Sequence, residues 1–304
     1  MNLARSITLI LLCMIMNNTH AQEHRYDPPW NSPPESAVNF TVPGIDNVPD
    51  LYGDIVDPQL VVFFAGNQFM VMDDLLAAFK KKYPNYQRIF VETLPPGILA
   101  KQIEGGSITI GNMRIDHKPD VYAAGKNRID SMSAHFSRVE TYAFNKLAIM
   151  VPKGNPKEIK SIKDLAEPSL KVAMPNPAWE GIGRQIVSVY NRLGGEKLEN
   201  AIMKEKVASG TTYLTKIHHR ESPMRILYQQ AEAAPVWYSE VVYQQLLDNP
   251  VEMVEIPERD NIRATYKIAE MKNAPRRQAA KDFVDFMQSE DAKAIYKKYG
   301  FETP

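Results

Sequence analysis

The feature that most constrains the fold is an alternation of short apolar runs with helical patterns, which begins at Gln59. The first run, residues 60–64, reads LVVFF and has no polar position, as expected of a strand buried on both faces. After the turn Gly66-Asn67-Gln68, apolar residues recur at helical spacing as far as Phe79. Because this order repeats to the end of the chain, the sequence predicts an α/β fold with mainly parallel sheets.

The remaining elements follow the same alternation. Further strands are predicted at residues 88–92, 119–124, 147–151, 170–174, 236–238, 251–256 and 263–269. Helices are predicted between them. One of these helices takes Ser222 as its N-cap, has Pro223 in its first turn and runs through Ala231.

The composition excludes several functional classes. The chain of 304 residues carries 36 Lys and Arg against 36 Asp and Glu, a net charge of zero. Since a neutral chain lacks the basic field with which proteins bind nucleic acid, no nucleic-acid partner is expected. The single cysteine, Cys13, excludes a disulfide framework and a cysteine-ligated metal site.

The N-terminus has the pattern of an export signal. Arg5 precedes an apolar run over residues 7–16, and a short polar stretch then leads to a cleavage point after Ala21. We therefore expect residues 1–21 to be a signal peptide and the mature protein to reach the periplasm. Residues 22–58 are rich in proline, which restricts the backbone and removes hydrogen-bond donors, so we expect an extended arm there or, as an equal alternative, a disordered leader. Residues 42–52 carry Val, Ile and Leu, so this part of the arm could lie against the body of the protein.

The motifs of common catalytic and cofactor sites are missing from the sequence. There is no G-x-S-x-G elbow, no G-x-x-x-x-G-K-[ST], no H-E-x-x-H and no G-x-G-x-x-G. Residues 181–183 begin like a dinucleotide-binding turn, but the third glycine does not follow. We therefore expect neither an enzyme nor a cofactor.

Tight polar turns follow several predicted strands and precede helices. They lie at residues 66–68, 96–97, 125–127, 176–183 and 220–222. In open α/β sheets, ligands bind beyond the carboxyl ends of the strands, where helix starts present unpaired N–H groups. Several such turns that meet in one crevice can hold an anion.

Six segments, taken in order, carry a resemblance to a known family. They are LVVFFAGNQFMVMDDLLAAF at residues 60–79, KPDVYAAG at 118–125, NKLAIMVPKGNP at 145–156, SIKDLAEPSLKVAMPNPAWEGIGR at 161–184, APVWYSE at 234–240 and AAKDFVDFMQSEDAKAIYKKYGF at 279–301. Together they resemble the bacterial periplasmic solute-binding proteins of ABC importers, most closely the molybdate-binding-protein-like group.

The resemblance implies a type II periplasmic binding fold, an α/β fold of two lobes joined by two crossing strands that act as a hinge. The crossings would fall near Leu147 and Val251, so that residues 59–146 and 251–304 form lobe one and residues 147–250 form lobe two. It also implies a monomer that binds a small polar ligand in the cleft between the lobes. The ligand would be an oxyanion, molybdate-like, or a carboxylate, delivered to the membrane permease of an ABC transporter.

The resemblance further implies which residues contact the ligand. Relatives hold an oxyanion with backbone amides and hydroxyl side chains in the first turn and at later helix starts. Carried onto this chain, these positions are Asn67, Gln68, Ala124, Gly125, Trp179, Glu180, Arg220, Glu221, Ser222, Trp237 and Tyr238. No metal ligand is among them.

These residues leave the class of ligand open. A carboxylate from Glu180 about 4 Å from a dianion would oppose binding by several kcal/mol, which would favour a zwitterionic or cationic ligand. The guanidinium of Arg220 favours a carboxylate or an oxyanion instead. Trp179 and Trp237 could stack on a ligand or pack in the core, and Arg220 could equally pair with Glu221 inside one lobe.

Three other interpretations are weighed. The pair His218-His219 invites a metal site, but adjacent residues of a strand point to opposite faces, so both cannot readily bind one ion. The proline-rich arm, residues 22–58, matches nothing in the family and could make the chain an accessory periplasmic protein that docks on a partner enzyme or sensor. An enzyme on this fold is disfavoured, because no nucleophile motif is present.

Overall fold

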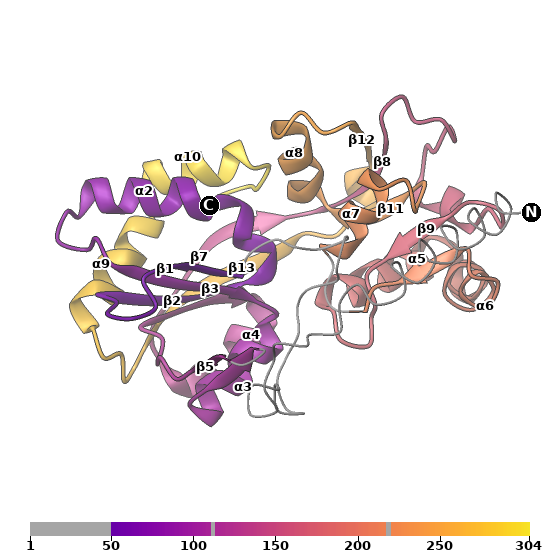
Figure 1. Ribbon diagram of the computed structural model, residues 1–304. Coiled ribbons are helices and arrows are strands. Elements are labelled where there is room, and N and C mark those ends of the chain that lie inside the picture. The colour runs from indigo at the N-terminus through magenta and orange to yellow at the C-terminus, as the bar shows by residue number, and fades with distance from the viewer. Residues whose placement is uncertain (1–49, 111–112, 217–219) are drawn as a thin grey trace, which may run out of the picture. The chain divides into compact units, whose positions relative to one another are not determined.

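The computed structural model describes residues 50–110, 113–216 and 220–304 (Figure 1). The predicted signal peptide, residues 22–49 of the predicted arm and the pair His218-His219 lie outside this range. Within it, no helix has the length and apolar character needed to cross a bilayer.

A six-stranded sheet organises the first hydrophobic core. Its strands, in order across the sheet, are β1 (Leu51–Gly53), β3 (Ile89–Leu94), β2 (Leu60–Ala65), β6 (Val121–Gly125), β13 (Ala264–Met271) and β7 (Phe136–Asn145). β2 runs parallel to β3 and β6, and all six of its residues are buried, as the apolar run predicts. β13 is antiparallel to both β6 and β7, and β1 is antiparallel to β3. The prediction of mainly parallel sheets is therefore wrong, because strands from distant parts of the chain enter this sheet in the opposite direction.

Helices cover both faces of this sheet (Figure 1). On one face lie α2 (Met72–Lys82), α9 (Arg277–Met287) and α10 (Glu290–Lys298), and on the other lie α3 (Pro96–Gly105) and α4 (Lys126–Ser131). The aromatic core under α2 and α9 joins Phe64, Phe79 and Phe283, with ring centroids 5.0 Å apart for the last two. This packing fixes the turn after β2, from which the first candidate ligand residues come.

A second group of strands forms a separate core. The three-stranded sheet contains β11 (Ala234–Trp237), β8 (Leu147–Pro152) and β12 (Val251–Glu255), and a parallel pair contains β9 (Val172–Met174) and β10 (Thr212–Leu214). Its helices are α5 (Gly181–Asn200), α6 (Lys206–Ala208), α7 (Glu221–Leu227) and α8 (Tyr238–Leu246). The short strands β4 (Ile108–Ile110) and β5 (Met113–Ile115) pair in antiparallel orientation as a sheet of their own.

The chain passes between the two groups of strands twice. β7 ends at Asn145 and β8 begins at Leu147, so the first passage needs only Lys146. Because β12 pairs with β8, the return passage lies at residues 256–263, after the position near Val251 that the resemblance implied. The Asn261 side chain connects the passages: its Oδ1 accepts from the Leu147 N–H at 2.9 Å, and its Nδ2 donates to the Leu147 carbonyl at 2.8 Å.

Two other expectations need correction. β1 falls within residues 22–58, the predicted extended arm, yet it is hydrogen-bonded to β3 as an edge strand of the six-stranded sheet. α7 begins at Glu221 with Arg220 as its N-cap residue and ends at Leu227, so Ser222 is inside the first turn and is not the N-cap. The carboxylate of Glu221 accepts from the Lys216 N–H at 2.8 Å, which supports the earlier start.

Candidate functional site

The turn after β2 holds the first two candidate residues in a buried polar cluster. This turn is a 3-10 helix, Gly66–Val71, in which Asn67 and Gln68 are buried. Asn67 Nδ2 donates to Tyr266 Oη at 2.6 Å, and Gln68 Nε2 donates to Asn67 Oδ1 at 3.4 Å. Burial raises the pKa of Tyr266 well above its usual range, so its hydroxyl stays protonated. Asn67 therefore contacts β13 directly and Gln68 is linked to it through Asn67, and no local sequence pattern indicated Tyr266 as a partner.

The second turn offers only its backbone. Ala124 is fully buried within β6, and Gly125 ends that strand as the N-cap residue of α4. A Cβ added at Gly125 would meet no atom within 4 Å, so space adjoins this backbone. Gly125 can approach a ligand closely, whereas the Ala124 side chain cannot.

The loop before α5 turns Glu180 inward. Its Oε1 accepts from the Asn176 N–H at 3.1 Å and also from the Thr215 hydroxyl, and the residue is 6% exposed. These bonds hold one oxygen of the carboxylate against its own loop and against Thr215, which follows β10. Trp179 is 52% exposed, so it is not a core residue.

Gly183 allows this loop to close on α5. A Cβ at Gly183 would lie 2.5 Å from the Pro175 carbonyl oxygen and 2.7 Å from the Pro177 nitrogen, both of them backbone atoms. Any larger residue would push the first turn of α5 away from the loop. Gly183 thus serves helix packing, a role that its place in a dinucleotide-like turn did not reveal.

At the start of α7, Arg220 is the centre of a buried cluster. The Arg220 side chain is 3% exposed, and its Nη2 lies 2.8 Å from Oδ1 of Asp50, which is 11% exposed. Its guanidinium carbon lies 5.1 Å from the centroid of the Phe69 ring, a cation–π distance. Asp50 and Phe69 belong to the six-stranded sheet and its first turn, whereas α7 packs on β8, β9 and β11. Arg220 thus joins the two groups of strands.

Glu221 does not belong to this cluster. Its Oε1 accepts from Tyr213 Oη at 2.7 Å and from Arg225 Nη2 at 2.7 Å, and the residue is fully buried. These partners belong to the same group of strands, so the contacts of the Glu221 carboxylate stay inside that group. Ser222 is also buried, and its Oγ has no hydrogen-bond partner among the described residues.

The start of α8 packs against Tyr266, the partner of Asn67. Trp237 is 7% exposed, and its ring meets that of Tyr266 edge-on with centroids 6.3 Å apart. The Trp237 N–H donates to Glu240 Oε2 at 3.0 Å, which caps the helix. Lys146 Nζ lies 4.5 Å from the ring centroid of Tyr238. The Trp237 ring therefore packs against Tyr266. The ring of Tyr238 is already covered by the Lys146 ammonium group.

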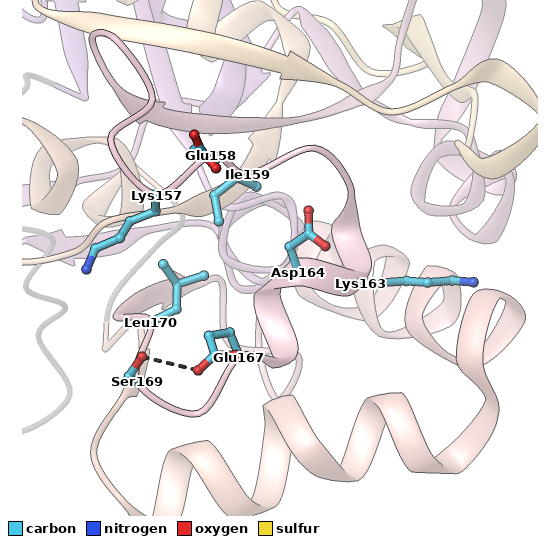
Figure 2. A pocket seen from close by; sticks show the side chains of 8 residues that line it. All are labelled: Lys157, Glu158, Ile159, Lys163, Asp164, Glu167, Ser169 and Leu170. Carbon is cyan, nitrogen blue, oxygen red and sulfur yellow. Dashed lines mark hydrogen bonds between the residues drawn. The ribbon is translucent and has the colours of Figure 1, made fainter.

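Two cavities differ in size and chemistry. A cavity of about 10 Å³, lined by Phe69, Arg220, Glu240 and Tyr243 among others, has room for about one water molecule. The larger one, about 400 Å³, lies around Lys157, Lys163 and Leu170 (Figure 2). Its three carboxylates outnumber its two lysines, and these lysines extend in opposite directions (Figure 2). It does not present converging cations to an anion.

The described residues hold no cluster of three or more His, Cys, Asp or Glu side chains that could bind a metal ion. The histidine pair considered for this role, His218-His219, lies outside the described residues. The residues that sequence reasoning missed are Asp50, Phe69 as a partner of Arg220, and Tyr266.

Comparison with known proteins is consistent with this architecture. The family model of bacterial extracellular solute-binding proteins matches residues 60–302. A Bacillus subtilis protein named as an ABC transporter substrate-binding lipoprotein, YvgL, is 25% identical over 158 residues, which cover 52% of this chain and 55% of that protein. The chain thus spans about half the length of this relative.

Solved structures share the fold at low identity. The periplasmic molybdate-binding protein of Azotobacter vinelandii is 18% identical with a TM-score of 0.66, over 81% of this chain and 99% of that one. The sulfate-binding protein SubI of Mycobacterium tuberculosis is 16% identical with a TM-score of 0.65, over 80% and 85% of the two chains. The predicted α/β fold of two-lobed periplasmic binding proteins is confirmed. The chain belongs to the family of bacterial extracellular solute-binding proteins.

Proposed function

We propose that this chain captures a small anionic solute, an oxyanion or a carboxylate, in the periplasm and delivers it to the membrane permease of an ABC transporter. The observation that carries the proposal is the environment of Arg220, a buried guanidinium that already binds a carboxylate. Residues 1–21 would direct export, and the chain would need neither catalysis nor a cofactor.

Burial of Arg220 is what makes an anionic ligand the best fit. An ionised side chain with 3% exposure loses most of its hydration, so it needs an anion beside it to remain stable. A planar guanidinium can donate two parallel hydrogen bonds to a carboxylate or to two oxygens of a tetrahedral oxyanion. The ring of Phe69 supports one face of the guanidinium and fixes its plane.

The neighbouring turns would complete the site. The backbone of Gly125 borders open space, and the buried Ser222 hydroxyl can donate to an oxygen. Asn67, Gln68, Trp237 and Tyr238 would shape its wall rather than bind directly, since each already contacts protein. We assign residues 59–145 and 264–304 to lobe one and residues 147–255 to lobe two, with hinge closure over the ligand.

A thermal-shift panel tests the proposal. Molybdate, sulfate, phosphate and small carboxylates would be compared with zwitterionic amino acids and divalent metals. A ligand at 100 times its dissociation constant should add about 2.7 kcal/mol to the free energy of unfolding. We expect at least one anion to raise the melting temperature. A rise in melting temperature with metals alone, or with zwitterions alone, would overturn the proposal of an anionic ligand.

A variant then tests the role of Arg220. Arg220→Met keeps much of the side-chain volume but removes the charge, and it should weaken the best anion of the panel by about tenfold or more. Arg259→Met, at a guanidinium that is 86% exposed in another part of the chain, is the matched control and should bind like wild type. Equal affinity in all three proteins would place Arg220 outside the site.

A further inference from the structure

Asp50 supplies Arg220 with a carboxylate from within the chain. It directly precedes β1, and its carbonyl accepts from the Thr93 N–H at 2.8 Å at the carboxyl end of β3. This is the edge of the six-stranded sheet at which α/β proteins bind ligands. The Asp50 carboxylate therefore lies at the ligand-binding edge, in contact with the buried cation.

The position of Asp50 is held by its neighbours. β1 pairs with β3 in register, Leu51 opposite Glu92 and Tyr52 opposite Val91. The Tyr52 hydroxyl donates to the Phe69 carbonyl at 3.4 Å, which ties β1 to the turn whose ring lies against Arg220. Burial raises the pKa of the Tyr52 phenol well above its usual range, so the hydroxyl remains a neutral donor. The pairing of Asp50 with Arg220 thus belongs to an ordered strand.

We propose that Asp50 competes with the ligand for Arg220 and thereby sets how tightly anions bind. This inference rests on the proposed function. The carboxylate joins the six-stranded sheet to α7 just as an anionic ligand between the two lobes would. A ligand that uses Arg220 must therefore displace Asp50, and breaking this ion pair lowers the apparent affinity of the ligand.

The competition predicts the sign of each effect. When the binding-competent form is only a fraction of the protein, the apparent dissociation constant rises by the inverse of that fraction. If Asp50 holds Arg220 in about nine molecules of ten, its removal should tighten anion binding about tenfold. Because this fraction is the same for every anion that binds through Arg220, formate and sulfate should both bind more tightly by the same factor in the variant.

The test uses formate and sulfate as probes and follows the melting temperature. Asp50→Ala removes the carboxylate, and formate, which restores one, should raise the melting temperature at concentrations about tenfold below those needed with wild type. Asp50→Asn keeps the shape and an oxygen acceptor without the charge, so it reports on competition even if the alanine variant is too unstable to melt cooperatively. The control Asp57→Ala removes a carboxylate that is 78% exposed in the same segment. Its melting temperature should shift with formate and sulfate at the same concentrations as in wild type.

The outcomes separate this inference from the proposed function. Tighter binding of formate or sulfate in both Asp50 variants, but not in Asp57→Ala, supports the competition. Equal responses in wild type and the Asp50 variants overturn it, while an anion that still requires Arg220 leaves the proposed function standing. If neither wild type nor any variant responds to any anion of the panel, both proposals fail.

Discussion

The buried carboxyl of Glu92 makes stability depend on pH in a direction opposite to that of most carboxylates. Glu92 lies in β3 with no exposed surface, opposite Leu51 of β1 and Phe63 of β2. Its Oε1 accepts from Gln102 Nε2 at 2.9 Å, and its Oε2 has no hydrogen-bond partner among the described residues. Burial raises the pKa of Glu92 from 4.5 to about 7, although the Gln102 hydrogen bond acts to lower it.

The sign and size of the effect follow from this shift. Between pH 4.5 and 7 the folded protein keeps a proton that the unfolded chain releases, so stability falls as the pH rises. The stabilisation is complete below pH 4.5 and is lost as the pH passes 7. At about 1.4 kcal/mol for each unit of pKa, this group alone lowers the free energy of unfolding by about 3 kcal/mol at pH 8.

Glu92→Gln is the matching perturbation, because the amide is neutral at every pH. In urea unfolding at pH 5, 6, 7 and 8, the free energy of unfolding should decline between pH 5 and 8 by about 2.5 kcal/mol more in wild type than in the variant. At pH 8 the variant should be the more stable protein. For Glu104→Gln, at an exposed position of α3, the free energy of unfolding should decline with pH as it does in wild type. If the free energy of unfolding declined equally with pH in wild type and in Glu92→Gln, the assignment of the pH dependence to Glu92 would be refuted.

Two further substitutions, the second with a matched control, test the parts of the fold that position the site. Asn261→Ala leaves the N–H and carbonyl of Leu147 without their side-chain partner, so we expect the free energy of unfolding, measured by urea denaturation, to fall by about 3 kcal/mol. A loss below about 0.5 kcal/mol would contradict the proposal that Asn261 connects the two passages. Gly183→Ala places a Cβ against the Pro175 carbonyl and should destabilise by about 2 kcal/mol or more, measured in the same way. Gly125→Ala enters open space and should change stability by less than about 1 kcal/mol, so an equal loss in both glycine variants would contradict the packing argument.

Local patterns predicted the elements whose burial is uniform. β2 was found because an uninterrupted apolar run is typical of a central strand, and α2 because its apolar residues recur at helical spacing. β7 was missed because it is the last strand of its sheet and half of it faces solvent, so polar residues such as Arg138 and Glu140 interrupt its pattern. Edge strands carry a weaker signal than central ones.

The site was predicted only at the level of its segments. The turns at residues 66–68 and 220–222 lie in or beside the buried polar clusters, and the ligand contacts that the resemblance implied for them stay a prediction. The partner of Arg220 could not be predicted, because Asp50 is distant in sequence and precedes β1, a strand too short to recognise. The inward orientation of Glu180 depends on a bond from Thr215, another contact between distant residues. Pairings of this kind arise from the topology, which local sequence does not specify.

A crystal structure grown with the anion that gives the largest thermal shift tests the central claim most directly. The account predicts an anion oxygen within hydrogen-bonding distance of the Arg220 guanidinium, with the Asp50 carboxylate displaced from the 2.8 Å contact. An anion bound only beside Lys157 and Lys163, with Arg220 and Asp50 still paired, would contradict it.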